Sequence, residues 1–289
     1  MPAGLIVHIP PVGFDPMTAS NSDLAKYGLP PRPTGQTKLA QWEKDYGTVK
    51  HWIDPTFTHL NQKLDTLSPN GGGWSGLTYD NSSQPASRVV GWWTQPFAYA
   101  PSQDQPAYSA SWIGLGGVNG DPLIQGGTES NVKSGGGGQY HAIWEIVGTN
   151  KSTGGAVTVN GLNNVPGDNM YCDISYSNGT ANFYFHDLTN GNAVSFSQTG
   201  ITGFSTNGEA DWITEDPNFN GSTLALTMAD YGSVRFTAES GTPSGVNYPP
   251  ANSSYDTYWY AQPNGDTVTY VSSHLNSTGN FTTSWENYN

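Results

Sequence analysis

Acidic side chains are sparse in the C-terminal part of the chain, and several fall in apolar, strand-like surroundings. They are Glu145, Glu209, Asp211, Glu215 and Asp216. Alternate residues of a strand face the same side, so Asp211 and Glu215 share one face of a predicted strand. A carboxylate at the edge of an aromatic cleft can take up and release a proton. The same pattern also fits an exposed face kept soluble by acidic groups, and the pattern alone favours neither interpretation.

Tryptophans accompany these acids in the predicted strands. They are Trp92, Trp93, Trp112, Trp144 and Trp212. Most are expected to lie in the core, because an aromatic ring packs well on a pleated surface. One or two of the rings are suited to form a platform for an extended peptide or sugar.

Other catalytic chemistries lack the residues that they need. No Gly-X-Ser-X-Gly elbow occurs, and the 6 histidines are scattered without a metal-binding spacing. The single cysteine, Cys172, lies in a strand-like run and is expected to be a small buried hydrophobe. We therefore expect no metal and no cofactor.

The composition limits the partners. The 289-residue chain has a formal net charge of −13 and no Lys/Arg cluster, so nucleic acid is not an expected partner. No apolar run approaches the roughly 20 residues of a membrane span. Only 11% of residues are charged, which leaves few carboxylate pairs to lose in acid. We expect a secreted, acid-tolerant monomer without a membrane partner.

Residues 1–67 differ from the rest of the chain. They hold most of the basic side chains and the only helix-like patterns. Residues 21–28 predict a short capped helix that ends at a glycine, and residues 39–46 and 56–64 predict two more. This stretch is expected to be an accessory N-terminal segment of mixed helical structure.

A Pro/Gly break at residues 68–73 starts a pattern of short alternating runs separated by turn residues. Asn-Gly pairs at 178–179, 190–191, 207–208 and 264–265 predict hairpin turns. The pattern predicts an all-β domain over residues 68–289, a two-sheet antiparallel β-sandwich of the jelly-roll or concanavalin-like kind. The expected strands are 89–97, 109–115, 140–147, 169–176, 180–187, 193–198, 210–214, 224–228, 233–238, 267–271 and 280–285.

Several segments of this domain follow one another in a recognisable order. They include Trp74-Ser75-Gly76, Ser111-Trp112-Ile113-Gly114, Leu123-Ile124-Gln125-Gly126, Ile143-Trp144-Glu145 and Ala210-Asp211-Trp212-Ile213-Thr214-Glu215-Asp216. Together they resemble the glutamic peptidases of the eqolisin family, acid endopeptidases that fold as two packed, largely antiparallel β-sheets. The resemblance extends over about residues 70–236.

By this resemblance Gln125 and Glu215 are the catalytic pair of an acid endopeptidase that cleaves polypeptides. Glu215 is implied to be the base that takes a proton from the attacking water and returns it to the leaving amine. Gln125 is implied to stabilise the oxyanion through its neutral amide. Supporting or substrate-binding positions are implied at Trp74, Trp112, Glu145 and Asp211.

The sequence departs from the family at Gly116, where several members carry an acidic residue, so any support from that acid must be absent or supplied elsewhere. Because the family's enzymes are made as precursors, residues 1–67 are a candidate propeptide of a zymogen.

Two other functions stay open from the sequence. A carbohydrate-binding or glycoside-hydrolysing β-sandwich protein would use two carboxyl groups, such as Glu145 and Glu215, and would not need Gln125. A non-enzymatic surface protein would cleave no substrate.

Overall fold

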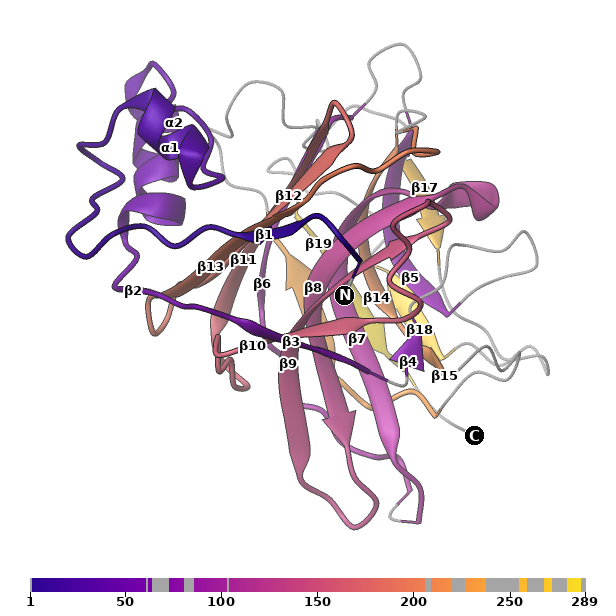
Figure 1. The fold of residues 1–289 in the computed structure, drawn as a ribbon. Helices are drawn as coiled ribbons and strands as arrows, with labels where there is room; N and C mark the ends of the chain where they lie inside the picture. The colour runs from indigo at the N-terminus through magenta and orange to yellow at the C-terminus, as the bar shows by residue number, and fades with distance from the viewer. Residues whose placement is uncertain are drawn as a thin grey trace.

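The computed structural model consists mainly of β-strands that form two packed sheets, with a small helical cluster at one corner (Figure 1). It describes residues 2–60, 62–63, 73–80, 86–102, 104–205, 209–219, 227–237, 255–258, 268–271 and 280–286. The predicted two-sheet, largely antiparallel β-sandwich is confirmed.

The larger sheet, sheet B, contains eight strands. In spatial order they are β17 (Tyr255–Tyr258), β5 (Trp74–Asp80), β14 (Glu209–Glu215), β7 (Ala107–Gly116), β8 (Leu123–Val132), β9 (Gly138–Val147), β10 (Val157–Asn160) and β3 (Thr56–His59). All neighbouring pairs are antiparallel.

The smaller sheet, sheet A, packs against sheet B. It comprises β1 (Leu5–Val7), β13 (Asn192–Gln198), β12 (Thr180–Asp187), β11 (Asn169–Ser177) and β6 (Arg88–Thr94), with β2 (His51–Trp52) parallel to β13. Two small sheets contain β16 (Ser233–Phe236), β19 (Phe281–Trp285) and β18 (Thr269–Val271), and β15 (Asn218–Phe219) with β4 (Gln62–Lys63). The helices are α1 (Asn21–Lys26), α2 (Gln36–Trp42), the π-helix η1 (Glu43–Gly47) and the 3₁₀-helix η2 (Val118–Gly120).

The main core fills the space between the two sheets. The ring of Trp144 on β9 lies 5.3 Å from those of both Phe183 and Phe196 of sheet A. The Trp212 indole on β14 donates to the Val90 carbonyl at 2.8 Å. Burial of each large apolar side chain contributes roughly 1.5–3 kcal/mol. These contacts confirm that most strand tryptophans are core, and they define the opposite face of sheet B as its outer face.

Several strand predictions agree closely with β11, β12 and β13. Asn178 and Gly179, with φ of +49° and +75°, form the predicted two-residue turn between β11 and β12. The pair at 190–191 lies in the turn between β12 and β13. The pairs at 207–208 and 264–265, and most of the strand expected at 224–228, lie outside the described residues. No strand was predicted from the sequence at β1, β2, β5, β8, β10, β15 or β17.

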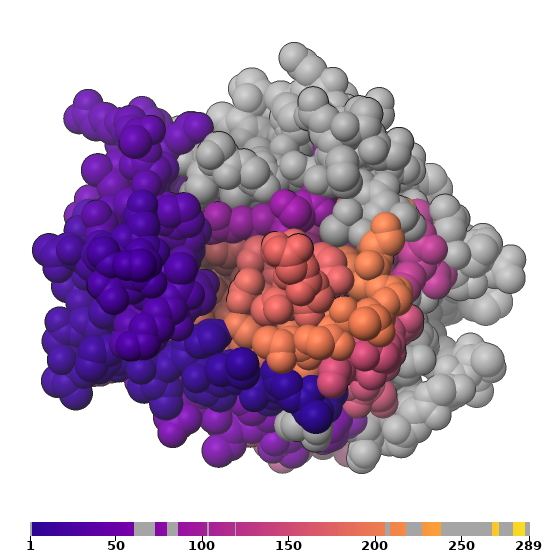
Figure 2. All heavy atoms as spheres, turned by 45° about the horizontal axis from the view of Figure 1, so that its top comes forward, coloured from indigo at the N-terminus to yellow at the C-terminus, as the bar shows by residue number. Residues whose placement is uncertain are grey.

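The predicted N-terminal helices cover the outer face of sheet A. Ser20 caps α1 by accepting from the Asp23 amide, as expected, while α2 and η1 together form the second predicted helix, residues 39–46. Trp42 and Tyr46 pack with Tyr184 in a second apolar cluster. Figure 2 shows the N-terminal segment as a layer along one side of the molecule. In this layer the Tyr46 hydroxyl donates to Asp173 at 2.6 Å.

The third predicted helix, residues 56–64, is wrong over its described part, because the chain there forms β3 and β4. Thr56, Phe57 and Thr58 alternate in exposure, with Phe57 half-buried. The Phe57 ring lies 5.1 Å from that of Phe196. β-branched and aromatic residues suit such a half-buried strand, and pairing with β10 outweighs the helical spacing.

Cys172 is buried on β11 with a free thiol, as expected for a small hydrophobe. No helix in the described part of the chain is long and apolar enough to cross a bilayer.

Candidate active site

Three rows of side chains cross the outer face of sheet B. Directly paired residues of an antiparallel sheet point to the same side. The first, the Gln125 row, joins Asp211 of β14, Gly114 of β7, Gln125 of β8 and Glu145 of β9. Only a glycine therefore separates Gln125 from Asp211. The structure brings three of the residues proposed from the sequence into this one row.

A second polar row, the Glu215 row, lies four residues beyond Asp211 along β14, with one row between it and the Gln125 row. It joins Glu215 to Trp74 on one side and to Ala110 of β7 on the other, and continues through Glu129 of β8 to His141 of β9. Glu215 and Trp74, both proposed from the sequence, are thus direct neighbours. Glu129 was missed, because the sequence analysis did not predict β8 as a strand. The alternation of Gln125, Gly127 and Glu129 is the signal that would have revealed it.

The middle row places Trp112 between the other two. Its indole Nε1 donates to Glu215 Oε2 at 2.9 Å, and its ring meets that of Trp74 edge-on at 4.8 Å. The opposite edge of the indole lies over Gly114, where a Cβ would be 3.0 Å from Trp112 Cζ3. The indole thus spans the gap between the Glu215 carboxylate and the Gln125 row, and it holds Glu215 in one orientation.

Gln125 and Glu215 lie on the same face, and the Gln125 amide does not hydrogen bond to Glu215. Gln125 and Glu215 are two strands apart and four residues apart along the strand, which in a flat sheet separates their Cα atoms by about 16 Å. Both side chains are long, and when they extend towards each other a peptide group can lie between their polar ends. Both polar atoms of the Gln125 amide are buried without a hydrogen-bond partner among the described residues. A buried amide without a partner is costly, and such groups occur where a ligand or substrate completes the bonding.

The candidate residues are shielded from solvent, although they lie on the face of sheet B that points away from sheet A. Gln125 and Glu215 are both 0% exposed. Leu60, which follows β3, packs on the cluster formed by Trp74, Trp112 and their apolar neighbours, and its amide donates to the Ala156 carbonyl at 2.8 Å. On the other side the turn after β7 folds over the face, and a Cβ on Gly117 would lie 3.2 Å from Trp74.

The segment containing Leu60 continues towards Glu215. Two residues after Leu60, β4 pairs with β15, which begins three residues after Glu215. The N-terminal segment therefore links the β10 edge of sheet B to the strand that follows the candidate base. Figure 1 shows this path from β3 beside β10 to β4 beside β15.

Burial changes the pKa of two other carboxyl groups of this face. It raises the pKa of Asp211 well above its usual range, and the charge of Glu209 adds to the effect. It raises the pKa of Glu129 to about 8, against the opposing effect of the Asn131 amide. Both groups are therefore neutral acids in acidic solution. Neither has a hydrogen-bond partner of good geometry among the described residues.

The backbone conformation explains why position 116 is a glycine where several family members carry an acidic residue. Gly116 has φ of +80°, and a Cβ there would lie 2.3 Å from the Pro122 carbonyl oxygen. No side chain fits without moving the turn. Any acidic group for this part of the site comes from another position, and the buried acids of this face among the described residues are Glu129, Glu145, Glu209, Asp211 and Glu215.

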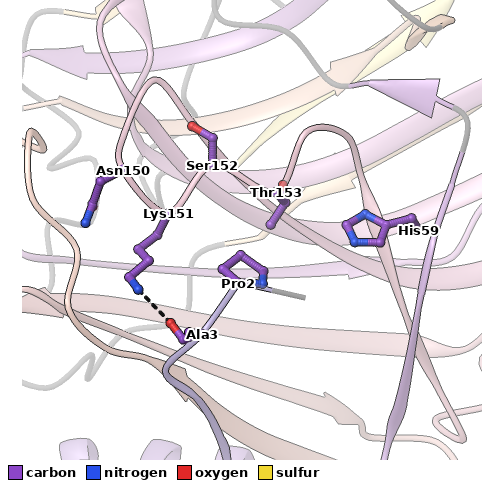
Figure 3. A pocket seen from close by; sticks show the side chains of 7 residues that line it. All are labelled: Pro2, Ala3, His59, Asn150, Lys151, Ser152 and Thr153. Atoms are coloured by element: carbon purple, nitrogen blue, oxygen red, sulfur yellow. Dashed lines mark hydrogen bonds between the residues drawn. The ribbon is translucent and has the colours of Figure 1, made fainter.

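Other features of the chain lie apart from this site. A hollow of about 300 Å³ is lined by Pro2, His59, Lys151 and their neighbours, and Lys151 Nζ donates a hydrogen bond to the Ala3 carbonyl at its border (Figure 3). None of the candidate residues lines it. No group of three metal-ligating side chains occurs among the described residues.

Comparison with known proteins places the chain in a family. A model of the Peptidase A4 family matches residues 72–285, most of the β-domain. The chain therefore belongs to this family, the eqolisins, and is a peptidase of the glutamic type.

Solved structures agree with the fold. A scytalido-glutamic peptidase bound to a transition-state-analogue inhibitor is 19% identical, covers 74% of this chain and 98% of its own, and superposes with a TM-score of 0.54. SCP-B, an eqolisin in complex with the tripeptide Ala-Ile-His, is 21% identical with the same coverage and a TM-score of 0.53. No curated protein sequence matches the chain.

Proposed function

We propose that this protein is a secreted, monomeric acid endopeptidase in which Glu215 is the general base and acid and Gln125 stabilises the oxyanion. The observation that carries the proposal is the hydrogen bond from Trp112 to Glu215, on a face where the Gln125 amide is buried and without a partner among the described residues. Family membership supplies the reaction class.

The reaction begins with a peptide lying across the Trp112 row. Glu215, ionised and held by the indole N–H, removes a proton from a water as its oxygen attacks the scissile carbonyl carbon. The carbonyl oxygen becomes an oxyanion, and the Gln125 amide donates to it. As the C–N bond breaks, Glu215 returns its proton to the leaving nitrogen, which departs as an amine. Asp211, neutral across Gly114, can hydrogen bond to Gln125 or to the substrate.

Acidic conditions suit this arrangement. Glutamine is neutral at every pH, so the Gln125 amide can donate to the oxyanion in acid as well. The proposal is tested by incubating the full chain with a denatured protein substrate between about pH 2 and 7, a range around the ordinary glutamate pKa of about 4.3. Cleavage confined to acid supports the proposal, and no cleavage at any pH overturns it.

The Glu145–Glu215 pair of the glycoside-hydrolysing alternative gains no support from this geometry. Glu145 lies one strand further from Glu215 than Gln125 does. In a flat sheet the Cα atoms of the two glutamates are about 20 Å apart, whereas the carboxyl groups of glycosidases lie about 5–9.5 Å apart.

Removing the indole N–H should weaken catalysis. We expect Trp112→Phe to lower kcat/KM by roughly ten- to a hundredfold, since a hydrogen bond to a charged group contributes about 1.5–3 kcal/mol. Initial rates on a fluorogenic peptide measure this. The matched control is Trp144→Phe, which changes a buried tryptophan of the same sheet on the core face. Equal losses in both variants would contradict a specific role for Trp112.

The N-terminal segment has two proposed roles. In the first, Leu60 and β4 act as a cover that keeps the chain in a zymogen state, since Leu60 packs on the apolar cluster beside the site and β4 pairs with β15, the strand after Glu215. The helices are structural, because they bury Trp92, Tyr171 and Tyr184 on the outer face of sheet A. Activation therefore requires the cover to open or be cut, while the helical layer stays in place.

The covering role predicts a lag. We expect the wild-type chain to hydrolyse a peptide in acid only after a delay, and Leu60→Ser to shorten the delay by weakening the apolar contact with the site. The control is Val12→Ser, a fully exposed position of the same segment. Progress curves after a jump to acid measure the delay, and identical delays in wild type and Leu60→Ser would rule out the cover.

A further inference from the structure

A hollow of about 320 Å³ lies at the tip of the β8–β9 hairpin, and none of the candidate catalytic residues lines it. Its floor belongs to a small apolar cluster, separate from the main core, that contains Ala98, Ala107, Val132 and Ala229. Alanine side chains are short, so they leave space above them. By alternation along β8, Val132 points to the side of sheet B opposite the two polar rows. The hollow is therefore distinct from the catalytic face but is built on two of the same strands.

Two aromatic side chains stand exposed at the rim of the hollow. Phe97 and Tyr99 are 61% and 63% exposed, whereas Ala98 between them is buried. This alternation is that of an extended chain, in which next-but-one side chains lie about 6.7 Å apart. Backbone hydrogen bonds in both directions, at 2.8 and 2.9 Å, join Tyr99 to Asp230. The two rings are thus presented side by side on a backbone that is held in place.

The opposite wall of the hollow is bare backbone. Residues 135–138 are four consecutive glycines, and all of them are exposed. For the first three, no described part of the chain outside their immediate neighbours comes within 4 Å of where a Cβ would lie. The hairpin tip therefore offers peptide groups and open space, and no side chain blocks the way round it.

Tyr140 connects the two walls. Its hydroxyl accepts a hydrogen bond from the Ala98 amide at 3.4 Å, and its ring packs on the alanine cluster. The ring also lies against the tip, since a Cβ at Gly138 would be 2.6 Å from the Tyr140 hydroxyl oxygen. Tyr140 thereby holds the aromatic rim and the glycine tip apart at a set distance. A hollow that is formed in advance needs little ordering when a ligand binds.

The lining of the hollow determines what it can bind. None of the described residues that line it is charged in acidic or neutral solution, although the chain has a formal net charge of −13. Exposed apolar side chains that cluster in this way are typical of binding sites. The spacing of Phe97 and Tyr99 equals the repeat of side chains along one face of an extended peptide. Bare peptide groups can add main-chain hydrogen bonds to such a peptide.

We propose that this hollow is a second binding site for polypeptide substrates, and that it takes an extended, uncharged segment with apolar side chains at alternate positions. The inference deepens the proposed peptidase function and rests on it. Binding here occurs at a distance from the scissile bond and anchors the substrate while another part of it reaches the catalytic rows. Two linked binding events raise the affinity for long chains without any change in the reacting groups.

Substrate length follows from the geometry. Val132 comes seven residues after Gln125 on β8, which corresponds to about 23 Å. An extended substrate of about ten residues spans roughly 33 Å, enough to pass from the catalytic rows round the glycine tip to the hollow. A substrate of about five residues spans roughly 17 Å and cannot reach both places.

The kinetic test therefore compares two substrate lengths. We expect the double variant Phe97→Ser/Tyr99→Ser to raise KM for a denatured protein about tenfold with kcat unchanged. Both constants should stay unchanged for a fluorogenic peptide of about five residues, which is too short to reach the hollow. Both substituted side chains are exposed, so their removal leaves the core intact. The matched control is Tyr270→Ser, at an exposed tyrosine of β18 that does not line the hollow.

Two outcomes of this comparison would overturn the second site. One is a KM for the denatured protein that is the same in wild type and in the double variant. The other is an equal loss on the long and the short substrate, which would indicate damage to the catalytic face. Failure of the proposed peptidase function would appear differently, as no cleavage of either substrate by wild type.

A binding measurement tests the hollow without any catalysis. The probe is a fluorescein-labelled peptide of about twelve residues that alternates leucine and serine, which is long enough to fill the hollow. Fluorescence anisotropy at about pH 7 should show a Kd about tenfold higher for the double variant than for wild type, as expected for the loss of roughly 1.4 kcal/mol of apolar contact. Phe97→Leu, which keeps an apolar side chain, should retain most of the affinity. Equal affinities in wild type and the double variant, or binding of cellohexaose in place of the peptide, would contradict a peptide site.

Discussion

Glu215→Gln is expected to abolish most acid-range peptide hydrolysis, with a loss in kcat of about 10²–10⁴. Glutamine has the shape of glutamate, and its Oε1 can still accept the hydrogen bond that Trp112 donates to Glu215. The variant should therefore fold and bind substrate while lacking a group that can remove a proton from water. Steady-state cleavage of a fluorogenic peptide between about pH 2 and 7 measures the effect.

A matched control comes from the surface. Glu286 is exposed, and Glu286→Gln removes the same charge far along the chain. It should leave both kcat and KM unchanged. Glu215→Asp adds a finer test, since a shorter carboxylate moves away from the indole N–H and should retain only part of the activity. Wild-type rates in Glu215→Gln would remove this residue from the mechanism.

Gln125→Ala is expected to lower kcat by about 10²–10³, the effect of losing one oxyanion-stabilising donor, or about 2.7–4 kcal/mol of transition-state stabilisation. KM should change little, because the amide acts mainly on charge that develops during the reaction. Gln139→Ala, at an exposed position of β9, is the control. Kinetic constants from peptide hydrolysis at the pH optimum provide the measurement.

The stability of the Gln125 variant carries independent information. The amide has no partner among the described residues, so its removal breaks no hydrogen bond there and relieves a buried unsatisfied group that costs about 1–3 kcal/mol. This gain offsets the small cavity left behind. We expect an unchanged or slightly higher Tm together with the large loss of activity. A large fall in Tm would indicate that Gln125 supports the fold instead.

Two further acidic groups of the outer face, Asp211 and Glu129, affect the charge around Gln125 and Glu215. Asp211 and Glu129 lie one in each of the two polar rows, and both are neutral acids in the buried face. They therefore add hydrogen-bond donors to the site without adding negative charge beside Glu215. This arrangement avoids the repulsion that three ionised carboxylates would cause.

The order of the motifs along the chain indicates the family, and the turn residues specify much of the fold. Asn178-Gly179 specifies its hairpin because both residues accept positive φ, and that is a local property. Alternation along a strand is equally local, and it suffices to place Asp211 and Glu215 on one face. Each of these features depends on neighbours in the chain, which a sequence displays directly.

Tertiary packing, in contrast, determines which side chains share a row. The pairing of Ala110 with both Glu215 and Glu129 joins strands that are far apart in sequence, and its register is set by packing of the whole sheet. The same packing makes residues 56–59 the strand β3 instead of the predicted helix and places Leu60 beside Ala156, against the apolar cluster that contains Trp74 and Trp112. The intrinsic preference of a residue for strand over other structure is worth about 1 kcal/mol or less. Pairing and burial of an entire strand stabilise the fold by more than that, so long-range contacts determine which residues form the site.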